Sequence, residues 1–142
     1  MKVRDVMTSP AIAIHDNESL SVAARTLTHY NIGVLPVQGQ NGKICGVITD
    51  RDIVTRCLAA NRSAENTTVA EIMTSQVLSV EPDMDAGAAA HLMGRQQVRR
   101  LPVVEQGKLC GMLSLGDLAQ QEEMAYDAGD ALADISSQIS NR

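Results

Sequence analysis

The chain contains one sequence unit written twice, and this duplication limits what it can fold into. Residues Val3–Ser9 (VRDVMTS) return as Val69–Ser75 (VAEIMTS). Further matches continue in the same order with a single one-residue shift: Leu35–Val37 with Leu101–Val103, Gly42–Gly46 with Gly107–Gly111, and Asp52 with Asp117. Matches spread over the whole unit predict two halves with the same fold.

The repeats also predict how the chain is divided. We expect four segments: repeat 1 over 1–60, a linker over 61–68, repeat 2 over 69–121, and a tail over 122–142. A repeat of this size buries little apolar surface and is only marginally stable alone. We therefore expect the two repeats to pack on each other about a pseudo-two-fold axis. In the tail, Leu132, Ile135 and Ile139 recur at spacings of three and four, which predicts a short amphipathic helix.

The residue pattern of each repeat predicts the element order β-α-β-β-α, so the expected fold class is α+β. The apolar runs Ala11–Ile14 and Val77–Val80 predict short first strands. Ser19 and Asp85 are good helix N-caps. The helices that follow share apolar positions at i, i+3, i+4 and i+7: Leu20, Ala23, Ala24 and Leu27, then Ala86, Ala89, Ala90 and Met93.

The second half of each repeat predicts a hairpin followed by a helix. The runs Val34–Val37 and Ile44–Ile48 flank a Gly-rich turn in repeat 1, and repeat 2 has the same pattern. In repeat 1 the helix after the hairpin is expected to bury one apolar face: Ile53, Val54, Cys57 and Leu58.

Composition and charge exclude several functions. The 142 residues include two Tyr and no Phe or Trp, so the chain lacks the aromatic platforms of single-strand nucleic-acid binders. A net charge of −5 disfavours binding to a phosphate backbone. No signal-peptide pattern occurs, and no segment has the roughly 18 apolar residues that cross a bilayer. We expect a soluble cytoplasmic protein with reduced thiols that contacts neither nucleic acid nor membrane.

The richest motif lies at the end of the hairpin. Repeat 1 reads Gly46–Asp52 (GVITDRD) and repeat 2 reads Gly111–Asp117 (GMLSLGD), so that a hydroxyl residue precedes an Asp by three positions. The plainer interpretation is a capping box, in which Thr49 or Ser114 caps the following helix. The functional interpretation is a carboxylate that accepts hydrogen bonds from a ribose diol, with phosphate nearby. One helix end can serve both roles.

With Met-Thr at the start, Leu-Pro-Val in the middle and this motif at the end of both repeats, the chain resembles a tandem pair of CBS domains. The whole chain, tail included, resembles small bacterial stand-alone proteins of that family. The resemblance implies a non-catalytic regulatory module with two clefts between the repeats. Such clefts bind AMP, ADP, ATP, S-adenosylmethionine or NAD. The resemblance also implies a homodimer and a protein target that the sequence does not identify.

The resemblance further implies which residues hold the ligand. Asp52 and Asp117 are expected to hold ribose hydroxyls, with Thr49 and Ser114 beside ribose or phosphate. The residues before Leu-Pro-Val are expected to line the pocket: Gly33 and Val34 in repeat 1, Arg99 and Arg100 in repeat 2. The first strand of the opposite repeat is expected to form the adenine pocket: Val77 and Leu78 with Asp52, Ala11 and Ile12 with Asp117.

The two sites differ in charge. Repeat 2 carries Arg99–Arg100 where repeat 1 carries Gly33–Val34, and guanidinium groups make charge-assisted contacts to phosphate. The Asp117 site is therefore expected to bind a phosphorylated ligand better than the Asp52 site. The Asp52 site stays a candidate, because it has Arg51 next to its motif where repeat 2 has Gly116. The alternative is that the arginines are a solvated surface pair.

Two other function classes compete with this hypothesis. The chain would be a structural or interaction dimer if its Asp residues only cap helices. It would be a metal or redox sensor if Cys45 and Cys110 were ligands, although such cysteines are usually small buried hydrophobes. His15, His29 and His91 show no ligand spacing with them. No nucleophile-plus-base arrangement occurs, so we expect neither catalysis nor a required cofactor.

Overall fold

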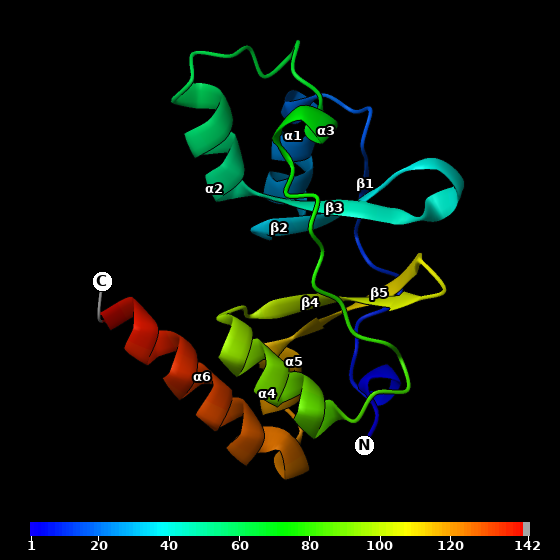
Figure 1. Cartoon of the computed structure of the whole chain (residues 1–142), viewed down its shortest axis with the longest axis vertical. Coiled ribbons are helices and arrows are strands. Elements are labelled where there is room, and N and C mark those ends of the chain that lie inside the picture. Colours follow the sequence, from blue (N-terminus) through cyan, green and yellow to red (C-terminus); the bar gives the residue numbers. More distant parts are fainter. Residues whose placement is uncertain (141–142) are drawn as a thin grey trace. The chain divides into compact units, whose positions relative to one another are not determined.

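The structure is a computed structural model that describes the backbone of residues 1–140 and the side chains of residues 1–137 (Figure 1). It forms two compact units, which are described separately. The Asp52 unit comprises Ile12–Val77. The Asp117 unit comprises Met1–Ala11 together with the chain from Leu78 onward.

The Asp52 unit contains a three-stranded sheet and the helices around it. Its elements follow one another along the chain: β1 (Ile14–His15), α1 (Leu20–Tyr30), β2 (Val34–Gln38), η2 (Gln40–Gly42), β3 (Ile44–Thr49), α2 (Asp50–Asp52), η3 (Ile53–Leu58) and α3 (Val69–Ile72). The strand order is β1-β2-β3, with β1 parallel to β2 and β2 antiparallel to β3. Its core is aliphatic and includes Leu20, Leu35 and Ile48, all fully buried.

The Asp117 unit contains a two-stranded hairpin covered by helices. Its elements are η1 (Val3–Asp5), α4 (Ala86–Gln96), β4 (Arg100–Glu105), β5 (Lys108–Ser114), α5 (Leu115–Ala119), η4 (Glu122–Met124) and α6 (Ala125–Ser140). Val80 adds a single parallel bridge to Val103, on β4. The predicted α+β class with two β-α-β-β-α repeats is confirmed.

The predicted helix caps are also confirmed. The Ser19 Oγ accepts a hydrogen bond from the Val22 amide at 3.3 Å, and the Asp85 Oδ2 accepts one from the Ala88 amide at 3.0 Å. Every predicted apolar position of α4 is buried. The predicted apolar positions of α1 are also buried, except for Ala24, which is half-buried. The small alanines of both helices pack in or against the cores of their units.

Two predicted elements differ from the structure. The first strands are shorter than expected, because Ala11–Ala13 and Val77–Ser79 lie outside the sheets. The helix after Asp52 is a π-helix, in which the Ala59 amide bonds to the Val54 carbonyl five residues back at 2.9 Å. The i→i+5 turn does not follow the 3.6-residue period assumed for its apolar face.

As a result, the prediction that this helix buries four apolar residues is wrong for two of them. Ile53 and Cys57 are buried, but Val54 and Leu58 are 54% and 59% exposed.

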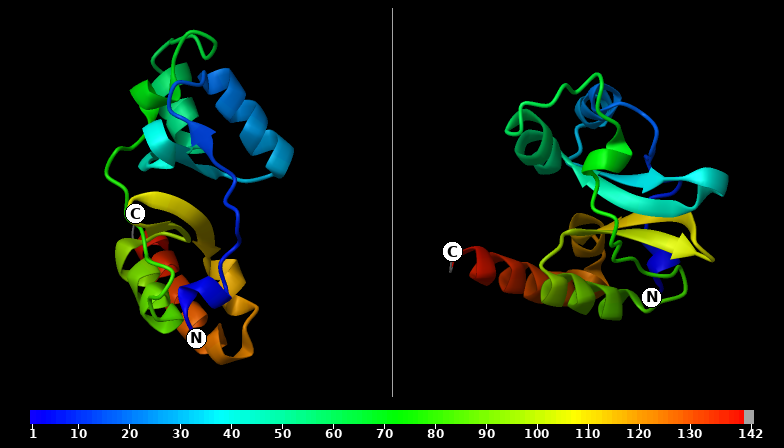
Figure 2. Two further views of the ribbon diagram at one scale, coloured as in Figure 1. Left: turned by 90° about the vertical axis from the view of Figure 1, so that its right-hand side faces the viewer. Right: turned by 45° about the horizontal axis from the view of Figure 1, so that its top comes forward.

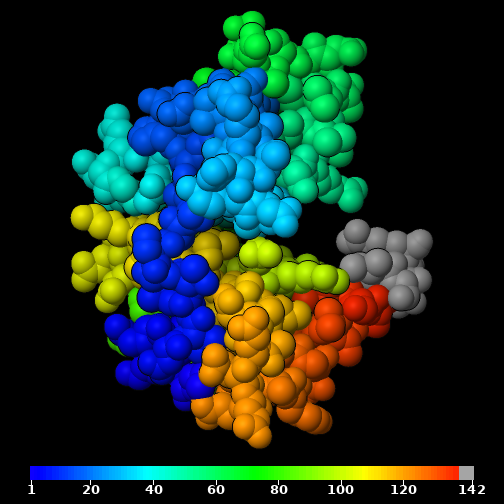
Figure 3. Space-filling model, turned by 180° about the vertical axis from the view of Figure 1, so that it is seen from behind, coloured from blue at the N-terminus to red at the C-terminus, as the bar shows by residue number. Residues whose placement is uncertain are grey.

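The compact units do not coincide with the sequence repeats, because each starting segment packs on the body of the other repeat. In the Asp117 unit, the Val3 amide bonds to the Met84 carbonyl at 2.9 Å. In the same unit Thr8 pairs with Met112, and Figure 3 shows this N-terminal segment, in dark blue, against the orange residues of that unit. In the Asp52 unit, the Val69 amide bonds to the Glu18 carbonyl at 2.9 Å.

The predicted tail helix is confirmed as α6. It packs along α4 and α5 (Figure 2) and buries Ala128, Ala131 and Ile135. Leu132 is 43% exposed, and the side chain of Ile139 lies outside the described residues. Among residues 1–140, no helix is long and apolar enough to cross a membrane.

Candidate functional site

Both copies of the hydroxyl-x-x-Asp motif form a reciprocal capping box where a strand turns into a helix. The Thr49 amide donates to the Asp52 Oδ2 at 3.0 Å, and the Asp52 amide donates to the Thr49 Oγ1 at 3.0 Å. The corresponding distances for Ser114 and Asp117 are 3.1 and 3.0 Å. The capping interpretation is therefore confirmed. It engages Oδ2 of each carboxylate and leaves Oδ1 outside the box.

The residues before Leu-Pro-Val lie beside the motif in both units. Val34 pairs with Thr49 across the hairpin, and Arg100 pairs with Ser114. This register follows from the antiparallel hairpin, which brings the start of its first strand to the end of its second. In the Asp117 unit the chain is also tied there by the Leu115 amide, which donates to the Arg99 carbonyl at 2.9 Å.

The Asp117 unit has a cavity of about 440 Å³ next to this motif. Part of its lining comes from the two arginines, the end of β5 and α5, and the rest comes from α6: Arg99, Arg100, Ser114, Leu115, Gly116 and Ala119, then Ala125, Ala128, Gly129 and Leu132. No role at this site was predicted for the tail, although its run of small residues was a signal. Helix α6 is therefore a wall of the candidate site.

Both arginines at this cavity are exposed and are not held by carboxylates. Neither Arg99 nor Arg100 forms an ion pair within residues 1–137. Two uncommitted guanidinium groups next to a hydroxyl residue suit an anionic ligand group.

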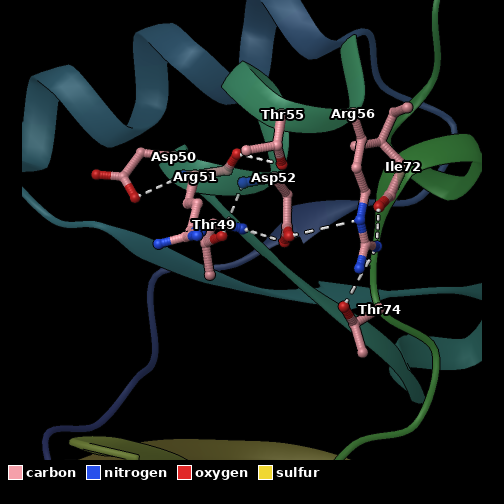
Figure 4. A network of polar contacts seen from close by, with 8 residues as sticks. All are labelled: Thr49, Asp50, Arg51, Asp52, Thr55, Arg56, Ile72 and Thr74. Atoms are coloured by element: carbon pink, nitrogen blue, oxygen red, sulfur yellow. Dashed lines mark hydrogen bonds and ion pairs between the residues drawn. The ribbon is translucent and has the colours of Figure 1, made fainter. Parts of the chain in front are cut away.

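The Asp52 motif has a neighbouring cation (Figure 4). The Arg56 Nε lies 3.8 Å from the Asp52 Oδ1, and the Asp52 side chain is only 15% exposed. The same guanidinium donates from Nη1 to the Ile72 carbonyl at 2.9 Å and lies 3.5 Å from the Thr74 hydroxyl. Sequence reasoning missed this contact.

The Asp117 motif has no such partner. The repeat alignment places Gln121 where repeat 1 has Arg56. Within the side chains that the structure describes, no Lys or Arg pairs with Asp117. The two carboxylates are thus capped alike but differ in charge environment.

The residues expected at the adenine ring lie outside the sheets. Val77 belongs to the Asp52 unit and is half-buried, while Leu78 belongs to the Asp117 unit and is 37% exposed. Ala11 lies in the Asp117 unit and Ile12 in the Asp52 unit. Their roles remain predictions.

The repeat-related cysteines are half-buried in their strands. The Cys45 thiol donates to the Val37 carbonyl at 3.6 Å, and the Cys110 thiol donates to the Val103 carbonyl at 3.2 Å. Burial raises the pKa of both thiols. Within the described part of the chain, no three His, Cys, Asp or Glu side chains come together in a way that could hold a metal ion.

Comparison with known proteins supplies the family. The CBS domain family model matches residues 3–59 and again 69–122. The chain is 39% identical over 136 residues to the CBS domain-containing protein YhcV of Bacillus subtilis, covering 96% of each chain.

Solved structures agree with the sequence matches. Hypoxic Response Protein I, crystallised with two coordinated zinc ions, is 30% identical with a TM-score of 0.79, and covers 85% of this chain and 98% of that one. The CBS domain pair of protein MJ0100, in complex with 5-methylthioadenosine and S-adenosylmethionine, is 31% identical with a TM-score of 0.74 over 84% of this chain and 94% of that one. CBSX2 in complex with AMP is 28% identical with a TM-score of 0.74 over 84% and 93%. The two family matches, the full-length relative and the shared fold together establish that this chain belongs to the CBS-domain proteins, as a tandem pair.

Proposed function

We propose that the chain is a regulatory module that binds an adenosine-containing ligand, and that it is not itself an enzyme. The observation that carries the proposal is the cavity of about 440 Å³ in the Asp117 unit, with Arg99, Arg100 and Ser114 on its wall. The complexes of CBSX2 with AMP and of the MJ0100 pair with S-adenosylmethionine support this ligand class.

Each part of the proposed site has its own task. The Asp117 Oδ1, which the capping box does not use, accepts hydrogen bonds from ribose hydroxyls. The guanidinium groups of Arg99 and Arg100 contact phosphate. Ala11, which belongs to the same unit, is proposed as apolar surface for the base. A ligand with at least one phosphate, such as AMP, ADP or ATP, is favoured over S-adenosylmethionine, because the sulfonium and ammonium groups of S-adenosylmethionine are repelled by two arginines.

The Asp52 site is proposed as the weaker of the two. Gly33 and Val34 stand where the other site has arginines, so these positions provide no cation for a phosphate. The proposed ligand contacts of this site are Thr49, Asp52 and Val77.

The proposed regulation uses α6. A ligand in the cavity contacts Ala125, Gly129 and Leu132 of this helix, so occupancy favours the packing of α6 that closes the wall. Coupling requires the ligand to bind that arrangement more tightly than any other. A protein target that contacts α6 would then sense the ligand.

We also propose that two copies associate. Val54 and Leu58 present apolar side chains on η3 that are 54% and 59% exposed, and a second copy would remove them from water. Sedimentation of the full chain tests this, with the Val54→Asp/Leu58→Asp double variant as control. Dimer for the wild type and monomer for the variant is expected, and a wild-type monomer contradicts the proposal.

Thermal shift against AMP, ADP, ATP, S-adenosylmethionine, NAD and Zn²⁺ tests the main proposal. A ligand present at about 100 times its Kd stabilises the folded chain by roughly 2.7 kcal/mol. The Arg99→Ala/Arg100→Ala variant is expected to lose the shift with AMP and to keep the smaller shift with adenosine. No shift with any adenosine compound at millimolar concentration overturns the proposal. A shift with Zn²⁺ alone favours the metal-sensor alternative.

A further inference from the structure

We infer that Arg56 limits ligand access to the Asp52 site: its guanidinium Nε lies 3.8 Å from the carboxylate oxygen that a ribose would use. The inference rests on the proposed function, since it takes Asp52 to be the ribose-binding group of its site. It states that the two carboxylates of the duplicated motif have different ligand access because of one substitution, Arg56 in one repeat and Gln121 in the other.

The geometry leaves Asp52 only one uncommitted oxygen. Its Oδ2 accepts the Thr49 amide at 3.0 Å. Its Oδ1 faces the Arg56 Nε at 3.8 Å, and the Asp52 side chain is 15% exposed. Little of the carboxylate is left for a diol, and a ribose that approaches Oδ1 must displace a cation. That displacement removes an attraction before the new hydrogen bonds form.

Arg56 is held in this position from a second direction. Its Nη1 donates to the Ile72 carbonyl at 2.9 Å and lies 3.5 Å from the Thr74 hydroxyl (Figure 4). The Thr74 backbone pairs in turn with Val47 on β3, by two hydrogen bonds of 2.9 Å. The side chain therefore spans from η3 to the segment after α3, and it is not a freely rotating surface arginine.

The second repeat is an internal control. Asp117 has the same capping box and a hydroxyl partner at the same distance, 3.0 Å. At the position that corresponds to Arg56 it has Gln121, and no cation pairs with it among residues 1–137. The substitution Arg56→Gln thus gives the Asp52 site the residue that the Asp117 site already has.

Calorimetric titration of the full chain with adenosine and with AMP tests the inference in an Asp117→Ala background, where the Asp52 site is measured alone. We expect D117A/R56Q to bind adenosine about three- to tenfold more tightly than D117A, the effect of removing a half-exposed ion pair. D117A/R56Q/D52N is expected to lose this gain. D117A/R56K, which keeps the charge, is expected to show none.

The sign of the effect distinguishes this role from general electrostatics. Arg51 is an exposed arginine on α2 whose backbone amide bonds to Asp50. Because AMP is an anion, Arg51→Gln is expected to leave AMP binding unchanged or weaker. The inference is overturned if D117A/R56Q binds adenosine no more tightly than D117A does while circular dichroism shows that the chain is folded.

The two proposals fail in distinguishable ways. If the wild type binds AMP through Asp117 and R56Q adds nothing, the inference is wrong and the proposed function stands. If the wild type binds no adenosine compound but R56Q gains binding that D52N removes, the inference stands and the proposed Asp117 site is wrong. If neither protein binds, both are wrong.

Discussion

Gly46 on β3 is expected to be a stability determinant, because the segment after α3 passes directly over it. A Cβ at this position would lie 2.5 Å from the Met73 Sδ and 2.9 Å from the Thr74 carbonyl oxygen. The methionine can move, but the carbonyl is backbone. It accepts the Val47 amide at 2.9 Å, while the Val47 carbonyl accepts the Thr74 amide at 2.9 Å.

The Gly46→Ala variant must therefore overpack this contact or push the segment off β3. If the segment stays in place, overpacking typically costs about 1–3 kcal/mol; if it moves away, the overlap is relieved and the two hydrogen bonds are lost, at about 1 kcal/mol each. We expect a loss of about 2–3 kcal/mol of unfolding free energy, which corresponds to roughly 6–12 °C in Tm for a chain of this size. Urea denaturation of the full chain, followed by circular dichroism, measures the free energy.

The Gly129→Ala variant is the matched control. Its added Cβ meets nothing within 4 Å on α6, so the helix gains about 0.5–1 kcal/mol. Gly111→Ala repeats the test in the Asp117 unit, where a Cβ would lie 2.8 Å from both the Met7 Sδ and the Thr8 carbonyl oxygen. If Gly46→Ala unfolds within about 0.5 kcal/mol of the wild type, the close packing of this segment is refuted.

Three further predictions concern pH, thiols and caps. The hydrogen bond from Arg4 lowers the pKa of Asp83 in the folded chain. The Arg4–Asp83 pair therefore stabilises the fold at pH values above the unfolded pKa of about 3.9, and this stabilisation is lost as the pH falls through the folded pKa. The urea midpoint of Arg4→Gln should lie below that of the wild type at pH 7 and converge with it below pH ~3; a constant gap contradicts the ion pair. Because burial raises the pKa of the Cys45 and Cys110 thiols, both should react with iodoacetamide more slowly than glutathione at pH 7.5, and equal rates would contradict this. Ser114→Ala removes one cap and should cost about 1 kcal/mol in urea denaturation, whereas an unchanged midpoint would show that the cap is unimportant.

Much of the fold could be predicted because the duplication tests each pattern twice. The α1 and α4 faces, with their caps Ser19 and Asp85, appear in both copies at matching positions. The partner of each starting segment could not be predicted. Val3 and Val69 begin equivalent segments, and the two repeats have the same apolar pattern. Periodicity therefore does not show whether a starting segment packs on its own repeat or on the other one. The π-helix was missed because a 3.6-residue period assigned Val54 and Leu58 to a buried face.

The candidate site was predictable to the extent that a hairpin fixes it. Antiparallel register alone places Arg100 beside Ser114 and Val34 beside Thr49. The α6 wall and the hydrogen bonds from Arg56 to Ile72 and Thr74 depend on packing between segments distant in sequence, which residue patterns do not encode. The i, i+4 spacing of Asp52 and Arg56, and the exchange of Arg56 for Gln121 between the repeats, were visible in the sequence.

The measurement that tests the central claim most directly is a calorimetric titration of the full chain with AMP, compared with Asp117→Ala and Asp52→Ala. Each substitution removes the carboxylate of one capping box and so lowers stability. Measuring the unfolding free energy of both variants separates this loss of stability from the loss of binding. We predict that Asp117→Ala weakens AMP binding at least about tenfold, the loss of a charged hydrogen-bond acceptor, and that Asp52→Ala changes it little. Equal losses, or a larger loss for Asp52→Ala, would contradict the claim that the Asp117 unit holds the principal ligand site.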